Sequence, residues 1–524
     1  MSVSSATEKS VGLSSGISLR EVFPEAMFVH ADDIRVSKCV SSLAECRNND
    51  LFVALLGPVD DGHEDAVQAI RRGAMAVVSE RLLPIDAPQC IVEDSRIAFG
   101  TIKHTLADQP CLKMQTVGVA GTDGKSTTSH LIASILETAG KSTGLHSSIP
   151  GSSIPDTSAA KGEPSKTDFT KSLARMVLAG KRMSVIEANS VALAQHQYAG
   201  MKLDVAVINN LRGNHFGFHS TLQNYRRAQL RLLDYLKPTG VAVINADDPG
   251  CHFALETIKT PTLTFGIKQQ ADVTARIIES DLYETTFVIT AGNDSAMVRT
   301  QLPGRHHVYN CLAATAAALL FGVDLQTIAR GLEKIQSLPG RMNVVKCGQK
   351  FALAIDEAAS PYRLGVALNT LQQNTTGKVY CVFSTPFDAD TRTASQFGRI
   401  AERHSAIPVI TRPTANGSVN LGERIEYEPI HQVLDGFDRP AKARTMPDRI
   451  AAIEWALAQA KPGDAVLIAG RGDQPIAQLS EGRWELSDME VCQSWLYGDS
   501  VPGETIPTTV TPPAIFKIDD YRIC

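Results

Sequence analysis

The amino-acid sequence predicts an α/β protein with a central, doubly wound and mostly parallel sheet. Apolar runs of strand length alternate with helical stretches along most of the chain. Several of these runs end in Gly, Asn or an acidic residue, and the carboxyl ends of parallel strands are where such sheets place their ligands. One run leads through a glycine-rich loop with a lysine into a helix, which is typical of a phosphate-binding turn.

Length and composition limit the classes of protein that this chain can represent. At 524 residues it is too long for one hydrophobic core, and about three domains are expected. A formal charge of −5 argues against a nucleic-acid binder, and the ten cysteines are scattered, as expected for reduced thiols. No apolar run reaches the roughly 18 residues of a membrane-spanning helix. We therefore expect a cytoplasmic monomer that inserts into no membrane and binds no nucleic acid.

The order of the predicted elements divides the chain into five segments. Residues 1–16 are rich in Ser and are expected to be disordered. Residues 17–112 predict a small α/β domain, with the strands DLFVALLG and MAVVSE on either side of the helix HEDAVQAIRRGA. Residues 113–337 contain four runs that predict parallel strands, MQTVGVAG, MSVIEA, LDVAVINN and GVAVINADD. Residues 338–498 predict a third α/β unit, with the strands FALAIDEA, KVYCVFS, IPVITR and DAVLIAG and the helix PDRIAAIEWALAQAK; residues 499–524 are a tail rich in Pro and Thr.

The strand MQTVGVA is followed by the loop GTDGKST and then by the helix SHLIASILETAG, which is the order of a phosphate-binding loop. Its glycines let backbone N–H groups turn toward phosphate oxygens, Lys125 supplies a point charge, and the Ser126 hydroxyl can reach Mg²⁺. The spacing departs from G-x-x-x-x-G-K-[ST], because Val119 stands at the first glycine position. The loop alone does not separate a kinase, an ATPase and a ligase. The residues expected to bind the nucleotide are Gly121, Thr122, Asp123, Gly124, Lys125, Ser126 and Thr127.

Seven stretches resemble, in order, the landmarks of the Mur ligase family, the ATP-dependent carboxylate–amine ligases of peptidoglycan assembly. They are GVAGTDGKSTT, VIEANSVAL, DVAVINNLRGNHFGFHSTLQNYRRAQ, INADD, LPGRHHVYNCLAA, LPGRMNVV and IAGRGDQ. The N-terminal DLFVALLGPVDDGHEDAVQAIRRGAMAVVSE resembles one branch, the UDP-N-acetylmuramoyl-tripeptide synthetases, which add the third residue of the stem peptide. The matches extend from about residue 30 to residue 497.

The resemblance implies a three-domain architecture, with an N-terminal domain for the UDP-linked substrate, a central ATP-binding domain and a C-terminal Rossmann-like domain for the amino acid. It also implies that ATP and Mg²⁺ are the cofactors, and that a UDP-muramoyl-peptide and an amino acid are the substrates. In that chemistry the substrate carboxylate attacks the γ-phosphate of ATP and forms an acyl phosphate. The amine of the amino acid then displaces phosphate.

Individual residues take roles from the motifs that they match. The resemblance implies catalysis by Lys125, His215 and Asp356; metal binding by Ser126, Glu187 and His215; nucleotide contacts by Asn310 and Arg341 besides the loop; and substrate contacts by Ser165, Thr167, Ser190, Gly470 and Gln474. From the residues alone, Glu187 remains open as an ordinary carboxylate at a strand end, and His215 as a structural histidine. His219 is expected to be a packing or surface residue.

The sequence departs from the family most at the second metal position. The family's Asp-His-Leu-Asp is replaced by residues 214–217, Asn-His-Phe-Gly, which lack both carboxylates. The family's lysine, which is typically carbamylated and so carries a negative charge, is replaced by Gln229. Because glutamine offers a dipole and no charge, we expect Gln229 to be a weak ligand for a second Mg²⁺, or a tolerated polar residue on a helix.

The implied substrate contacts are also changed. Residues 42–44, Ser-Leu-Ala, stand where the branch has an Asp-Ser-Arg element for uridine, and residues 165–167, Ser-Lys-Thr, replace Thr-Thr-Pro. Diaminopimelate-adding members carry Asp-Asn-Pro-Arg, whereas here Arg412 and Pro413 lie out of register with that motif. Residues 470–474, Gly-Arg-Gly-Asp-Gln, replace Gly-Lys-Gly-His-Glu and remove a carboxylate that would face the incoming amine.

Three functions remain open at this point. The first is an active ATP-dependent ligase that adds an amino acid to a UDP-muramoyl-peptide in peptidoglycan precursor synthesis. The second is an ATP-binding paralogue with little or no ligase activity and a regulatory or scaffold role. The third is an unrelated phosphate-loop kinase or NTPase, which gives no role to PGRMN or to the last α/β unit. We therefore expect the ligase.

Overall fold

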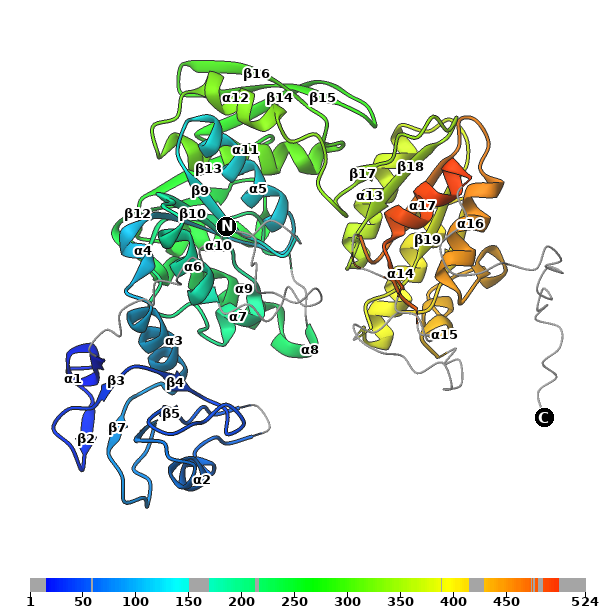
Figure 1. The fold of residues 1–524 in the computed structure, drawn as a ribbon. Helices are drawn as coiled ribbons and strands as arrows, with labels where there is room; N and C mark the ends of the chain where they lie inside the picture. Colours follow the sequence, from blue (N-terminus) through cyan, green and yellow to red (C-terminus); the bar gives the residue numbers. More distant parts are fainter. Residues whose placement is uncertain are drawn as a thin grey trace, which may run out of the picture. The chain divides into compact units, whose positions relative to one another are not determined.

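The computed structural model describes residues 16–57, 60–149, 169–212, 216–387, 389–413, 428–472, 474, 476–478 and 484–498. By their contacts these residues fall into two compact units, divided between Leu338 and Pro339 (Figure 1). The first unit contains a five-stranded and a nine-stranded sheet, and the second contains a six-stranded sheet. The expected α/β class with mostly parallel sheets is confirmed.

The N-terminal part of the first unit is built on a sheet with the strand order β2-β7-β6-β5-β4, in which β2 alone is antiparallel to its neighbour. One face of the sheet packs against Ala98 and Ile102 of α3, and the other packs against Ala66 and Ala69 of α2. The elements are β1 Ile17–Ser18, α1 Leu19–Val22, β2 Met27–Val29, β3 Arg35–Val36, β4 Cys39–Val40, β5 Leu51–Val53, α2 Ala66–Arg71, β6 Ala76–Ser79, β7 Gln89–Ile91 and α3 Ser95–Leu106.

The central sheet has the strand order β16-β15-β14-β13-β12-β11-β8-β10-β9. Strands β8 to β14 pair with one another in parallel. Strands β15 and β16 extend the sheet as an antiparallel meander that the sequence patterns did not predict. The strands are β8 Gln115–Ala120, β9 Thr143–His146, β10 Met183–Glu187, β11 Leu203–Ile208, β12 Leu236–Asn245, β13 Thr262–Gly266, β14 Val273–Ser280, β15 Thr285–Ala291 and β16 Asp294–Thr300.

Helices cover both faces of this sheet, which makes it doubly wound. Successive side chains of β8 and β11 point to opposite faces of the sheet. On one face, Val117, Val119 and Val207 pack with α5, α11 and α12. On the other face, Ala120 and Ile208 pack with α4, α6 and α7. The helices are α4 Pro110–Lys113, α5 Lys125–Thr138, α6 Phe169–Leu178, α7 Ser190–Ala194, α8 Phe216–His219, α9 Leu222–Leu230, α10 Pro249–Thr257, α11 Arg305–Leu319 and α12 Leu325–Glu333, with a 3₁₀ helix at Arg231–Tyr235.

The second unit has the strand order β17-β18-β22-β19-β20-β21, with β17 antiparallel at one edge and the other strands parallel. Its helix α16 begins at an Asp448 cap and buries Ile453 and Leu457 against the sheet. The strands are β17 Asn343–Val344, β18 Ala352–Asp356, β19 Val379–Phe383, β20 Ile407–Ile410, β21 Arg444–Thr445, β22 Ala465–Ala469, β23 Ile476–Gln478 and β24 Trp484–Leu486. The helices are α13 Pro361–Gln373, α14 Thr391–His404, α15 Glu428–Leu434, α16 Arg449–Gln459 and α17 Asp488–Tyr497, with a 3₁₀ helix at Pro440–Lys442.

Across the part of the chain that the structure describes, no helix combines the length and the apolar character that crossing a membrane requires.

Candidate active site

The loop between β8 and α5 has a backbone that requires glycine at both ends. Gly121 has a φ of +138° and Gly124 a φ of +79°. A Cβ on Gly124 would lie 2.2 Å from Asn310 Oδ1, so α11 approaches the loop too closely for a side chain. The Asn310 side chain, implied by the sequence as a nucleotide contact, is buried against this loop and also lies 3.4 Å from His307 Nδ1.

Two asparagines at the end of β11 hold the middle of the loop. Thr122 N–H donates to Asn210 O at 3.0 Å, and Asp123 N–H donates to Asn210 Oδ1 at 2.9 Å. Asn210 Nδ2 returns a bond to Asp123 O at 3.1 Å, and Asn209 Nδ2 donates to Thr128 Oγ1 at 3.0 Å. These bonds exist because Ile208 pairs with Ala120 in the sheet, which sets the residues after both strands side by side.

Lys125 opens α5 and folds back over the loop. Its Nζ donates to Gly121 O at 2.8 Å and to Thr122 O at 3.2 Å, and the side chain is half-buried. The ammonium therefore sits at the N-terminal end of a helix, where backbone N–H groups also favour an anion. Thr127 follows in the same turn and is buried.

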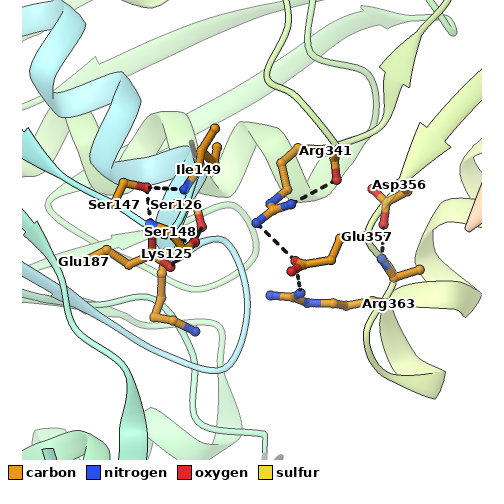
Figure 2. A network of polar contacts seen from close by, with 12 residues as sticks. Lys125, Ser126, Ser147, Ser148, Ile149, Glu187, Arg341, Asp356, Glu357 and Arg363 are labelled. Carbon is orange, nitrogen blue, oxygen red and sulfur yellow. Dashed lines mark hydrogen bonds and ion pairs between the residues drawn. The ribbon is translucent and has the colours of Figure 1, made fainter. Parts of the chain in front are cut away.

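Glu187 ends β10 and collects hydrogen bonds from three serines (Figure 2). Ser126 Oγ donates to Oε1 at 2.9 Å, while Ser147 Oγ and Ser148 N–H each donate to Oε2 at 2.8 Å. Burial alone would raise the pKa of Glu187, but the Lys125 charge and the bonds from Ser148, Ser147 and Ser126 outweigh it and lower the pKa. The carboxylate is therefore ionised beside a hydroxyl at the base of the phosphate loop.

This pair suits a hard divalent cation, because both residues supply oxygen and one supplies a charge. The register explains their closeness, since Glu187 pairs with Val119 one residue before the end of β8. Among the described residues, no group of three or more His, Cys, Asp or Glu side chains is arranged for a metal ion. Within the described part of the chain, Ser126 and Glu187 therefore offer a cation one carboxylate and a hydroxyl.

Ser190 and His219 contact each other in the first unit. Ser190, implied as a substrate contact, is buried, and its Oγ lies 3.0 Å from His219 Nε2. His219 also stacks edge-on against Tyr225, with ring centroids 5.2 Å apart. His219 is thus a buried packing residue, which is one of the two roles that the sequence led us to expect.

In the second unit, Asp356 holds two turns of the backbone. Its Oδ2 accepts the Met342 N–H at 2.8 Å and its Oδ1 accepts the Ala358 N–H at 2.7 Å. Met342 and Ala358 have φ values of +46° and +34°, in the left-handed region that non-glycine residues rarely adopt. Burial raises the pKa of Asp356 despite these bonds and the Arg341 charge. Both carboxylate oxygens, which the sequence assigned to catalysis, are engaged in shaping this loop.

Arg341 lies in a charged cluster within the same unit. Its Nη2 is 3.1 Å from Glu357 Oε2, which also pairs with Arg363 Nη1 at 2.9 Å (Figure 2). Gly470 has a φ of +109° and donates its N–H to Asp356 O at 3.1 Å, while Gln474 is exposed. Arg341, Asp356 and Gly470 are thus brought to one end of the six-stranded sheet.

Several sequence-based assignments lie outside the described residues, namely His215, Ser165 and Thr167. Conversely, the sequence reasoning missed Ser147, Ser148, Asn209 and Asn210. A signal was present for Asn209 and Asn210 alone, which directly follow the apolar strand β11, whereas Ser147 and Ser148 follow the short strand β9, Thr-Gly-Leu-His.

Comparison with known proteins places the chain in a family. The family model described as Mur ligase middle domain matches residues 119–318, and the model described as Mur ligase, glutamate ligase domain matches residues 340–472. The UDP-N-acetylmuramoyl-L-alanyl-D-glutamate–2,6-diaminopimelate ligase of Geobacillus thermodenitrificans is 33% identical over 457 residues, covering 85% of this chain and 91% of that protein. The protein of the same name from Syntrophomonas wolfei is 31% identical over 475 residues, covering 89% and 96%.

Solved structures show the same fold. A structure of a UDP-N-acetylmuramoyl-L-alanyl-D-glutamate–2,6-diaminopimelate ligase aligns with a TM-score of 0.64 at 24% identity, covering 92% of this chain and 99% of that one. The MurF ligase of Thermotoga maritima, solved in complex with ADP, aligns with a TM-score of 0.56 at 21% identity, covering 83% and 94%. The sequence relatives, the two family models and the shared fold agree that this chain belongs to the Mur ligase family.

Proposed function

We propose that this chain is an ATP-dependent ligase that joins an amino acid to the carboxylate of a UDP-muramoyl-peptide-type acceptor, in peptidoglycan precursor synthesis. The observation that carries the proposal is the phosphate loop, in which Lys125, Ser126 and Glu187 converge at the carboxyl edge of the central sheet. The ligase names of the relatives, which cover most of the chain, support the same reaction.

The phosphates of ATP would lie against the loop and the N-terminus of α5. There the backbone N–H groups and the Lys125 ammonium would stabilise the charge that spreads over the transferred phosphoryl group. Lys125 Nζ now bonds Gly121 O and Thr122 O, and a phosphate oxygen would take over as its acceptor. The acceptor carboxylate would attack the γ-phosphate and release ADP, and the amine would then displace phosphate from the acyl group and lose a proton.

Ser126 Oγ and the Glu187 carboxylate, whose oxygens lie 2.9 Å apart, would hold Mg²⁺ beside this loop. When bound, it neutralises charge on the phosphates of ATP. Ser147 and Ser148 keep Glu187 oriented toward Ser126 through bonds to the other carboxylate oxygen. Catalysis by Asp356 and His215 and a nucleotide contact by Arg341 remain proposals from their motifs.

The proposal specifies the substrates less closely than it specifies the reaction. The relatives are named for diaminopimelate, but this chain lacks the Asp-Asn-Pro-Arg motif and has Gln474 in place of a glutamate. We propose that the amino acid differs from diaminopimelate and that the chain acts as a cytoplasmic monomer without a nucleic-acid partner. Ser165, Thr167, Ser190 and Gly470 stay as proposed substrate contacts.

A coupled assay tests the reaction. Purified protein, ATP, Mg²⁺, UDP-muramoyl-dipeptide and a mixture of amino acids should release phosphate only when both acceptor and amine are present. Omission of either component serves as the control. Release of phosphate at the same rate with and without the acceptor would contradict the ligase function.

A second candidate is an ATP-binding paralogue with little or no ligase activity. The observations that favour it are the loss of both carboxylates in residues 214–217 and the replacement of the family lysine by Gln229. ATP binding without acceptor-dependent turnover in the same assay would select this candidate.

A further inference from the structure

Gln229 lies on α9, and its side-chain amide is paired with the main chain of Gly121. The Gly121 N–H donates to Oε1 at 3.0 Å, and Nε2 donates to Gly121 O at 3.2 Å and to the Tyr225 hydroxyl at 2.8 Å. These partners fix the orientation of the amide, because a reversed amide would set two donors against each other. The side chain is 1% exposed, so water does not replace these bonds.

The neighbouring turn of α9 holds the next loop residue. Tyr225, one helical turn before Gln229 and also 1% exposed, donates its hydroxyl to Thr122 Oγ1 at 3.0 Å. Thr122 Oγ1 additionally accepts the Arg212 N–H at 3.0 Å. One face of α9 therefore fixes two consecutive residues of the phosphate loop.

The second metal position implied by the family does not fit this arrangement. A ligand for Mg²⁺ must present oxygen lone pairs, preferably with negative charge. Gln229 is neutral, its oxygen already accepts the Gly121 N–H, and both of its N–H groups point at acceptors within the loop and α9. Gly121 O also accepts from the Lys125 ammonium, which brings a positive charge close to the Gln229 amide and disfavours a cation there. The side chain for which the sequence left a weak metal ligand or a tolerated polar residue open hydrogen-bonds the backbone of the loop.

We propose that Gln229 is a positioning residue for the phosphate loop, and that the chain binds its nucleotide with one divalent cation, at Ser126 and Glu187. The inference rests on the ATP binding of the proposed function. In this chain, an amide that holds the Gly121 peptide in place stands where the family has a charge that would hold a second ion.

The isosteric variant Gln229→Glu separates a positioning role from a metal-ligand role, because the two roles predict opposite changes in the affinity for an ATP analogue. A carboxylate cannot donate to Gly121 O, so positioning predicts that a non-hydrolysable ATP analogue binds at least about tenfold more weakly, with or without Mg²⁺. A metal-ligand role predicts tighter binding in the presence of Mg²⁺, and that result would overturn the proposal. Gln223→Glu adds the same charge at an exposed position of α9 and should leave the affinity unchanged.

Cation stoichiometry gives a second readout that needs no variant. Mn²⁺ bound per chain in the presence of the analogue, counted by electron paramagnetic resonance, should be one for the wild type. Two bound Mn²⁺ ions would overturn the single-cation inference and leave the proposed function intact. A wild-type chain that binds no analogue at all would overturn both.

Tyr225→Phe covers the case in which Gln229→Glu does not fold. It keeps the buried ring and removes only the hydroxyl between Gln229 Nε2 and Thr122 Oγ1. Because this hydroxyl makes two hydrogen bonds and one net hydrogen bond is worth about fivefold, analogue affinity should fall at least about fivefold, with the Mn²⁺ count unchanged. Wild-type affinity in this variant would contradict the role of α9 in supporting the loop.

Discussion

Replacing Gly124 by alanine should damage the phosphate loop through two separate effects. Gly124 has a φ of +79°, and placing an L-residue in this left-handed region costs about 1–2 kcal/mol. The new Cβ would also lie 2.2 Å from Asn310 Oδ1, so the buried Asn310 side chain must move. Overpacking of this kind costs about 1–3 kcal/mol. We therefore expect a total destabilisation of about 2–5 kcal/mol.

Gly140→Ala is the matched control, because it carries the first effect without the second. Gly140 has a φ of +75° just beyond the other end of α5, and nothing lies within 4 Å of the position of its Cβ. This variant should lose about 1–2 kcal/mol of stability. Since Gly140 and the loop lie at opposite ends of α5, the affinity of Gly140→Ala for nucleotide should match that of the wild type.

The assay combines unfolding of each variant in denaturant with calorimetric titration of a non-hydrolysable ATP analogue. Gly124→Ala should bind the analogue at least about tenfold more weakly, because each 1.4 kcal/mol lost in the binding conformation is a factor of ten. The reasoning is refuted if both variants lose the same stability and both bind the analogue as tightly as the wild type does.

Three further predictions concern the site. Lys125→Ala should abolish binding of the ATP analogue, because it removes the ammonium that now donates to loop carbonyls and that would donate to a phosphate oxygen; unchanged calorimetric affinity would contradict the phosphate role. Glu187→Ala should shift the Mg²⁺ titration of turnover to higher concentration by more than it changes nucleotide affinity, since a metal ligand acts through the ion; an unshifted titration excludes that role. In a competition assay, diaminopimelate should gain no wide preference over lysine, ornithine and alanine, because no positioned arginine and carboxylate are in register for its distal groups; a strong preference would show that other residues supply them.

The buried parallel strands could be predicted from the sequence because they are apolar on both faces. β8, β10 and β11 each appear as a mostly apolar run that leads into a different residue type, namely Gly121 after β8, Glu187 at the end of β10 and Asn209 after β11. Strands β14 and β16, which pair with β15 in antiparallel fashion, gave no such signal. Each carries an exposed large apolar residue, Ile278 and Met297, which obscures the alternation of a half-buried strand.

Much of the site could not be predicted, because its bonds join residues that are distant in sequence. The motif identified Gln229 as a substitution, but only the structure shows its amide paired with Gly121, 108 residues away. Ser147 and Ser148 match no phosphate-loop pattern, and they reach Glu187 because β9 lies beside β10 in the sheet. Asp356 retained the carboxylate that the family pattern led us to expect, yet its backbone bonds to Met342 and Ala358 became visible only in three dimensions.

The distance along the chain between the loop and its supports has a consequence for biosynthesis. Gly121 and Thr122 leave the ribosome early, but the Tyr225 and Gln229 side chains that hold them are separated from them by 103 and 108 residues. At translation rates of about 5–20 residues per second, the loop waits roughly 5–20 s for these partners. A nascent chain that ends before α9 carries the complete glycine-rich motif without the groups that shape it. We therefore expect nucleotide to bind the central domain at full affinity only after residue 229 has emerged, and a stalled shorter chain to gain less protection from ATP.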